Sequence, residues 1–230
     1  MLAIIAGLLP VLFPDNYFIT VVGIAAGINV ILAVGLNLLM GYAGQISLGH
    51  AAFFGMGAYA SAVLTTRYAF PPLLALGTGL ISAGLIAWLL ARPILRLHGH
   101  YLAMATLGFG IIIHVIMVQA TGWTGGPDGL TGIPPLILLG WAVDSDQRWY
   151  LVIMAAALLA IGLSLNLVDS RVGRALRAVR GSEFAARMMG IDTARVKTQV
   201  FVVSALFAAF AGNLFAHQQG FVSPDSFNLG

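Results

Sequence analysis

Five polar side chains interrupt long apolar stretches of this sequence: Asn37, Gln45, Ser47, His50 and Thr106. A hydroxyl beside an imidazole is the pairing that serine hydrolases use, so Ser47 and His50 are the first pair to consider. The two residues are three positions apart, so their proximity follows from the sequence alone and does not indicate a catalytic pair. No Gly-x-Ser-x-Gly or His-Glu-x-x-His motif is present. Polar groups in apolar surroundings are typical of side chains that face a bundle interior or a wet cavity. The five residues are therefore candidates for a translocation path, with interhelical hydrogen bonding as the alternative.

The composition indicates which solvent surrounds the elements that carry these residues. Only 8% of the 230 residues are charged, against about 25% in soluble proteins. The hydrophobic fraction is 60%, and the mean hydropathy is +0.96. A soluble globule of this size cannot cover so much apolar surface, so the sequence predicts a membrane protein. There is no cysteine, which excludes disulfides and thiolate metal sites; we predict no catalytic residue, no metal and no cofactor.

The charge-free runs are long enough for membrane-spanning helices. Residues 16–66 carry no formal charge, and a crossing helix needs about 20 apolar residues. The alternating segments of a membrane barrel are absent. We predict an all-α, polytopic helical membrane protein in which residues 1–230 form one transmembrane domain of about seven spans. The expected spans are 1–13, 17–40, 46–66, 72–95, 101–121, 149–168 and 198–217.

The distribution of Lys and Arg predicts the orientation. Alternating crossings place Arg92, Arg96 and the basic residues of 171–197 on one side, and Arg67 and Arg148 on the other. The positive-inside rule makes the richer side cytoplasmic, together with the N-terminus. Because orientation accounts for the formal net charge of +3, we predict no nucleic-acid partner.

Two loops are long: an outer one over 122–148 and an inner one over 169–197. The outer loop is rich in Gly, Thr, Asp and Pro, which predicts an ordered turn region or a flexible lid. In the inner loop, arginines recur every third residue over 171–180, as expected for a basic amphipathic helix.

A second, shorter helix is expected later in the inner loop. Gly181 breaks the first helix, Ser182 can cap a new one, Gly190 suits its end and Asp192 can cap the next. The short helix 183–190 and its arginines either bind anionic lipid headgroups or dock a cytoplasmic partner. Residue spacing alone does not decide between them.

The Gly-rich segment 41–49 separates two expected spans with hardly any loop. Two structures fit this pattern. One is a tight cytoplasmic turn, and the other is unwound backbone that lines a cavity.

Four blocks of sequence, taken together, resemble a known family. They are GLNLLMGYAGQISLGHAAF at 35–53, YLAMATLGFG at 101–110, TGGPDGLTGIP at 124–134, and residues 171–220. In this order they resemble the permeases of branched-chain amino-acid ABC importers, of the LivM type. Two departures stand out. Relatives often carry Glu and Arg where this chain has Ile111 and His114, and they extend by further spans, so the chain looks C-terminally truncated.

The resemblance implies that 169–197 is the coupling loop, which contacts an ATP-hydrolysing subunit. Importer permeases carry Glu-Ala-Ala-x-x-x-Gly there, and this chain matches it at Ala185, Ala186 and Gly190, with Arg187 between them. Phe184 stands in the usual Glu position and Glu183 one place earlier, so the family's usual Glu contacts are not carried over to Glu183.

The resemblance also implies a function and partners. The chain would be the permease subunit of an ATP-driven importer for branched-chain amino acids in a bacterial inner membrane, working by alternating access. Cytoplasmic ATP-binding subunits, a second LivH-like permease, an extracytoplasmic solute-binding protein and membrane lipid would be its partners. No phosphate-binding loop is present, as expected if ATP hydrolysis resides on partner chains. The alternatives are a secondary carrier and a urea- or amide-type ABC permease.

Overall fold

The computed structural model describes residues 17–227 except 98, 139 and 140. The expected span 1–13 lies outside the described residues. Six long helices form the body of the described part. They are α2 (Tyr17–Leu36), α3 (His50–Arg67), α4 (Pro72–Ile94), α5 (His100–Gln119), α7 (Asp146–Asp169) and α10 (Thr193–Gln219). The predicted all-α, polytopic fold is confirmed.

Short elements connect the long helices. The helical ones are the π-helix η1 (Asn37–Tyr42), α6 (Thr121–Thr124), the 3₁₀ turn η2 (Gly126–Asp128), α8 (Arg171–Gly181), α9 (Glu183–Met188) and the 3₁₀ turn η3 (Pro224–Phe227). The strands are β1 (Leu130–Thr131), β2 (Ile137–Leu138), β3 (Trp141–Ala142) and β4 (Phe221–Val222). β1 pairs antiparallel with β4, with Leu130 opposite Val222, and β2 pairs with β3.

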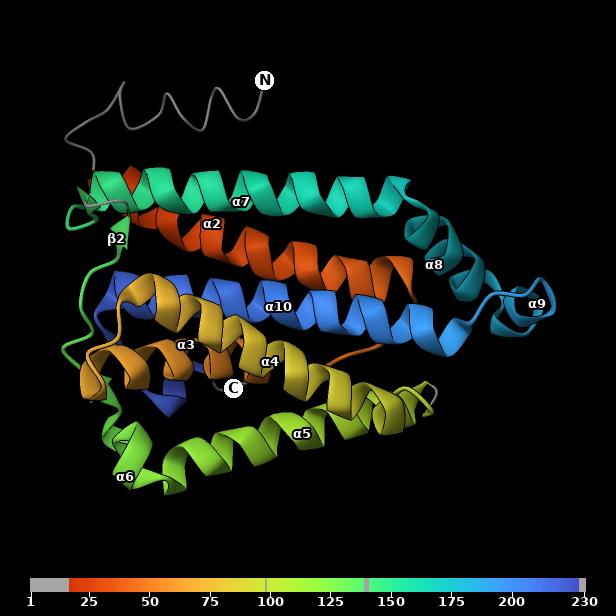
Figure 1. Ribbon diagram of the computed structural model, residues 1–230, viewed down its shortest axis with the longest axis horizontal. Helices are drawn as coiled ribbons and strands as arrows, with labels where there is room; N and C mark the ends of the chain where they lie inside the picture. Colours follow the sequence, from red (N-terminus) through yellow and green to blue (C-terminus); the bar gives the residue numbers. More distant parts are fainter. Residues whose placement is uncertain (1–16, 98, 139–140, 228–230) are drawn as a thin grey trace.

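The long helices run side by side along the long axis of the molecule (Figure 1). α8 and α9 lie at one end of the bundle, which we call the α9 end. α6 and the β2 segment lie at the opposite end, the α6 end. Arg92, the last-turn arginine of α4, and the arginines of α8 therefore lie at the α9 end, whereas Arg67 ends α3 at the α6 end. The predicted charge asymmetry between the two ends is thus present in the fold.

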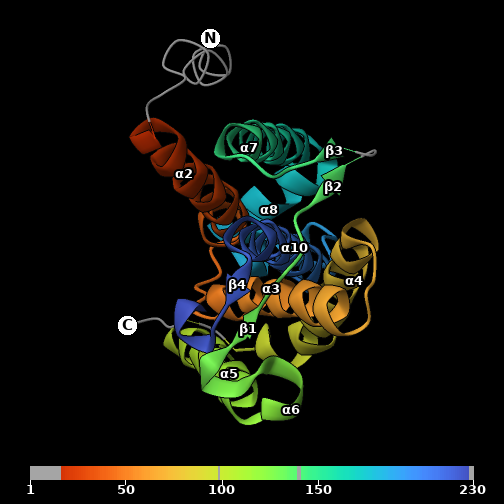
Figure 2. The ribbon, with the colours of Figure 1, turned by 90° about the vertical axis from the view of Figure 1, so that its left-hand side faces the viewer.

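α10 occupies the centre of the bundle, with α2, α3, α4 and α7 around it (Figure 2). Glycines allow the close approach of α3 and α10 that this position requires. A Cβ on Gly57 of α3 would lie 2.1 Å from the carbonyl oxygen of Ala209, and one on Gly212 of α10 would lie 1.9 Å from that of Phe54. Because backbone meets backbone at both crossings, only glycine fits there.

Among the residues that the structure describes, five stretches are long and apolar enough to cross a membrane: Thr20–Tyr42, Pro72–Ile94, His100–Gln119, Asp146–Asp169 and Thr193–Gln219. The expected span 46–66 is not among them. α3 begins only at His50 and is 18 residues long, and its Ser, Thr and Gly residues pack inside the bundle. Large apolar side chains such as Ile81 and Met104 face outward, as expected of helices surrounded by lipid rather than water.

Candidate functional site

The chain between α2 and α3 is unwound and does not form a tight turn, whereas the expectation that segment 41–49 lines a cavity stays a prediction. η1 widens the end of α2, and Ala43–Gly49 then form no helix. Gly44 adopts a φ of +66°, and the Gln45 N–H donates to the Leu39 carbonyl at 3.1 Å. The connection runs back along the bundle before α3 begins (Figure 1). We call Ala43–Gly49 the break.

Three of the five predicted path residues meet at the break. The Leu48 N–H donates to Thr106 Oγ1 at 3.0 Å, and the same hydroxyl donates to the Ala103 carbonyl at 3.0 Å. Gln45 and Ser47, which belong to the break itself, are buried. The Thr106 hydroxyl thus accepts from the Leu48 N–H, a backbone donor that has no partner within a helix. Unwound chain inside a membrane protein requires such partners.

The other two residues lie elsewhere. Asn37 begins η1 and is exposed. Its Oδ1 lies against Gly41, where a Cβ would come within 2.3 Å. His50 begins α3, just after the break, and faces a cavity.

The His50 cavity has a volume of about 410 Å³, and α2, α3 and α10 contribute to its wall. Apolar side chains such as Ile28, Leu32 and Phe54 make most of the lining, and Asn29 and Gln218 add polar groups. The His50 Nδ1 lies 3.5 Å from Ser204 Oγ. Within the described part of the chain, His50 Nε2 and Gln218 Oε1 are buried without a hydrogen-bond partner. An apolar cavity of this size with a few polar groups suits a small amphiphilic molecule.

α8 is the predicted amphipathic helix, and it contacts η1. Ser170 caps it by accepting from the N–H groups of Val172 and Gly173 at 3.1 and 3.4 Å. Leu176 and Val179 are buried while the arginines are exposed. Arg180 donates to the carbonyl oxygen of Gly41. The arginine stripe therefore reaches the η1 segment that precedes the break.

The predicted caps of the next two helices, α9 and α10, are confirmed. Ser182 accepts from the Ala185 N–H at 3.2 Å, and Asp192 accepts from the Arg195 N–H at 3.0 Å. Gly190 has a φ of +82°, the left-handed conformation that favours glycine. The helix itself ends at Met188 rather than at 190, because its last residues form the turn into α10.

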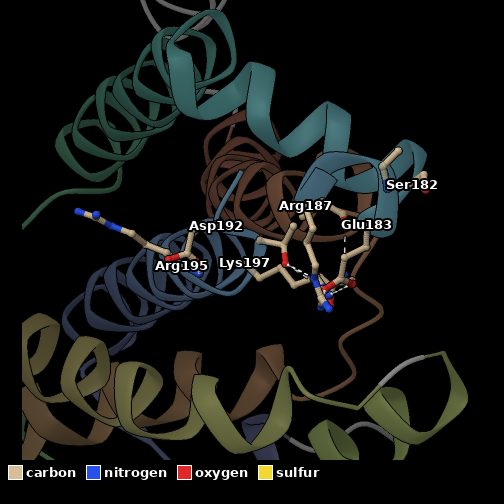
Figure 3. A network of polar contacts seen from close by, with 10 residues as sticks. Ser182, Glu183, Arg187, Asp192, Arg195 and Lys197 are labelled. Atoms are coloured by element: carbon tan, nitrogen blue, oxygen red, sulfur yellow. Dashed lines mark hydrogen bonds and ion pairs between the residues drawn. The ribbon is translucent and has the colours of Figure 1, made fainter. Parts of the chain in front are cut away.

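Glu183 joins α9 to α10 (Figure 3). Its carboxylate accepts from Lys197 and Arg187, and from the Thr193 hydroxyl at 3.2 Å. Burial alone raises the pKa of Glu183, but hydrogen bonds from Lys197 and Arg187 outweigh it and lower the pKa to about 2. The Lys197 side chain is only 2% exposed. The pair therefore fixes the position of α9 relative to the central helix.

The far side of α9 is apolar and open. The exposed fractions are 75% for Phe184, 74% for Met188 and 83% for Met189. Ala186 is buried against the bundle, whereas Ala185 and Arg187 are exposed. α9 projects beyond the ends of the long helices (Figure 1). Such an apolar cluster on a projecting helix is typical of a protein-docking surface.

Two groups of residues were not among the predicted site residues. Lys197 and Thr193 complete the Glu183 cluster, and the available signal was that Lys197 is the only lysine of the sequence, just before an apolar run. The second group is a hydroxyl–imidazole pair, Ser61 with His217. The His217 Nδ1 lies 2.8 Å from the Pro134 carbonyl, which can only accept, so Nε2 accepts from Ser61 at 2.7 Å. Both residues are buried, and they anchor the 122–148 segment to the bundle.

Comparison with known proteins places this architecture in a family. The model of the family described as "Branched-chain amino acid transport system / permease component" matches residues 17–230. The LivM proteins of Salmonella typhimurium and Escherichia coli, named as high-affinity branched-chain amino acid transport system permease proteins, are each 38% identical over 204 residues. That alignment covers 77% of this chain and 47% of theirs.

More distant relatives carry other names. The autoinducer 2 import system permease protein LsrC of Yersinia enterocolitica is 30% identical over 171 residues, covering 73% of this chain and 43% of LsrC. No solved structure matches. The chain thus spans about half the length of the curated relatives it matches. By its family match and its identity to LivM, this polytopic membrane chain belongs to the permease family of branched-chain amino acid transport systems.

Proposed function

We propose that this chain is the membrane-spanning permease subunit of an ATP-driven importer for branched-chain amino acids. The observation that carries the proposal is the Glu183 cluster, which attaches an exposed apolar helix to α10. α10 is 27 residues long, or about 40 Å, and its other end contributes Phe215 and Gln218 to the His50 cavity. A displacement of α9 is therefore transmitted along a continuous helix to the cavity.

A second connection runs through the break. Arg180 of α8 holds the Gly41 carbonyl, and the break that follows is held to α5 by Thr106. A cytoplasmic ATP-binding subunit docked on Phe184 and Met188 would move both connections together. Coupling requires that ATP favour one of two arrangements of the helices. The proposed coupling residues are Glu183, Ala185, Ala186, Arg187 and Gly190.

The cavity supports the substrate class. Among its polar lining groups are Asn29, His50 and Gln218, and the rest is mainly aliphatic and aromatic. The aliphatic and aromatic part of the wall accommodates a branched side chain. Asn37, Gln45, Ser47 and Thr106 complete the proposed path with His50 at and near the break.

The orientation and the partners follow from this proposal. The basic α9 end would face the cytoplasm. α2 begins at the α6 end (Figure 1), so a cytoplasmic N-terminus would follow from the expected span 1–13. A second LivH-like permease would complete the path, and an extracytoplasmic solute-binding protein would deliver substrate to the α6 end.

The test is transport by the full-length chain reconstituted in proteoliposomes with the subunits that co-purify with it. We expect an ATP-binding subunit among them, and uptake of labelled leucine that stops when ATP is depleted. Uptake that continues without ATP would instead identify a secondary carrier. Uptake of urea or an amide but not of leucine would identify the other ABC permease type.

A further inference from the structure

A positively charged cleft lies between α4 and α10 at the α9 end, away from the His50 cavity. Its volume is about 620 Å³. Trp88 and Arg92 of α4 line one wall, and Arg195, Thr198 and Gln199 of α10 line the other. The Arg92 guanidinium lies 5.5 Å from the centre of the Trp88 ring, a cation–π contact that orients it.

The cations of the cleft are available to an outside ligand. Within the part of the chain that the structure describes, Arg92 and Arg195 have no ion-pair partner. The one acidic side chain in the lining, Asp192, accepts from the backbone N–H of Arg195 as the cap of α10. The Arg195 side chain extends away from the Glu183 cluster (Figure 3). Two guanidinium groups against one carboxylate leave net positive charge, and guanidinium geometry matches phosphate oxygens.

An apolar groove continues from this cleft toward the middle of the bundle. Its volume is about 410 Å³, and apolar side chains form it throughout, with Leu80 of α4, Leu163 of α7 and Leu206 and Phe210 of α10 among them. Val203 lines both the cleft and the groove, so the two adjoin at this residue. α4 and α7 flank α10 on this side, and α3 lies beneath it (Figure 2).

The dimensions match one lipid leaflet. From Arg195 to Phe210, α10 rises about 22 Å, and half of a bilayer including its headgroups is about 20–22 Å thick. Trp88 lines the cleft beside Arg92, and tryptophan concentrates at the headgroup level in membrane proteins. A soluble anion would use the cleft but would leave the groove empty.

We propose that this cleft and groove bind one anionic phospholipid of the leaflet at the α9 end. Its phosphate is held by Arg92 and Arg195, and one acyl chain lies along Leu163, Leu206 and Phe210. The inference does not depend on the proposed transport activity. It differs from a general attraction of basic residues to the membrane because it names two arginines and a bounded acyl groove.

The first experiment measures retained lipid. The full-length chain, with its associated subunits, is transferred into nanodiscs of equal parts phosphatidylglycerol and phosphatidylethanolamine and examined by native mass spectrometry. We expect one phosphatidylglycerol to be retained. Arg92→Gln with Arg195→Gln should lower retention about 25-fold, at about fivefold for each cation. Arg171→Gln with Arg174→Gln, two exposed arginines of α8 outside the cleft, is the charge-matched control. Equal loss in that control, or unchanged retention in the double variant, overturns the site.

The second experiment identifies what occupies the groove. A photoreactive benzoylphenylalanine at Leu163 should give a phospholipid adduct, and its yield should fall in Arg92→Gln with Arg195→Gln. An adduct with a second permease chain, or with another segment of this chain, would show that protein covers the groove and would overturn the proposal.

Discussion

Glu183 and Lys197 form an ion pair across 14 positions of sequence and thereby join the projecting helix α9 to the central helix α10. The lysine is buried and the carboxylate is partly exposed, so the pair lies at the boundary between the bundle and the α9 end. Because Arg187 and Thr193 share the same carboxylate, the cluster holds α9 in one orientation.

Lys197→Met should uncouple α9 from α10. The substitution keeps the length of the buried side chain and removes the cation, so Glu183 retains Arg187 and the Thr193 hydroxyl but loses its ion pair with α10. We expect insertion to be normal and substrate-stimulated ATP hydrolysis to fall at least tenfold in the reconstituted complex. In a double-mutant cycle, Glu183→Gln should add little to Lys197→Met. Additive effects of the two substitutions would show that they act separately.

The Glu183 cluster also predicts a pH dependence. The pKa of Glu183 is lowered to about 2 in the folded chain. Its stabilising contribution to the free energy of unfolding is therefore complete above the pKa of the unfolded chain, near 4.3. This stabilisation is lost as the pH falls from about 4.3 through about 2, and the total loss is at most about 3 kcal/mol. The melting temperature should therefore be insensitive to this group between pH 5 and 8 and fall below pH 4. Fluorescence-detected melting of the wild type and Glu183→Gln checks this, since the variant should lose less stability on acidification.

Gly190→Val should strain the turn after α9. The φ of +82° disfavours any side chain, although nothing lies within 4 Å of the new Cβ. The strain should cost about 1–2 kcal/mol. It should change the orientation of α9 and leave the packing of the bundle intact. We expect normal insertion with lost uptake. Gly181→Ala is the control, because Gly181 has equal space and no positive φ. Unchanged uptake and unchanged stimulated ATP hydrolysis in Gly190→Val would contradict a coupling role.

Thr106→Val should destabilise the break. It leaves the Leu48 N–H without its acceptor, at a cost of about 1–3 kcal/mol for a buried unsatisfied donor. Thr106→Ser keeps the hydroxyl and should retain most of the stability and uptake. A melting temperature for Thr106→Val equal to that of Thr106→Ser would mean that water replaces the hydroxyl at this position.

Gly212→Ala should separate α3 from α10. The new methyl group would meet the Phe54 carbonyl oxygen, a backbone atom that cannot rotate away. We expect a loss of about 1–3 kcal/mol or more from overpacking, measured by thermal unfolding in detergent. Gly77→Ala on α4, with nothing within 4 Å of its Cβ, should be neutral or slightly stabilising. Equal stability of the two variants would show that the α3–α10 crossing readily adjusts.

The sequence by itself determined the membrane class, the positions of most long helices, the N-caps of α9 and α10 and the glycine turn between them. These depend on local properties: an apolar run long enough to cross lipid, a serine or aspartate that caps its own helix, and a glycine at positive φ. The caps at Ser182 and Asp192 and the turn at Gly190 were predictable because each acts within three or four residues of itself.

Tertiary structure decided which of these elements meet. Thr106 could be identified as polar in an apolar helix, but not as the acceptor for Leu48, 58 residues earlier in the chain. Likewise the hydroxyl–imidazole contacts join Ser61 to His217 and Ser204 to His50, 156 and 154 residues apart, and not the neighbours Ser47 and His50. The spacing of residues along a helix determines which face they share, whereas the partner of that face depends on how helices distant in sequence pack together.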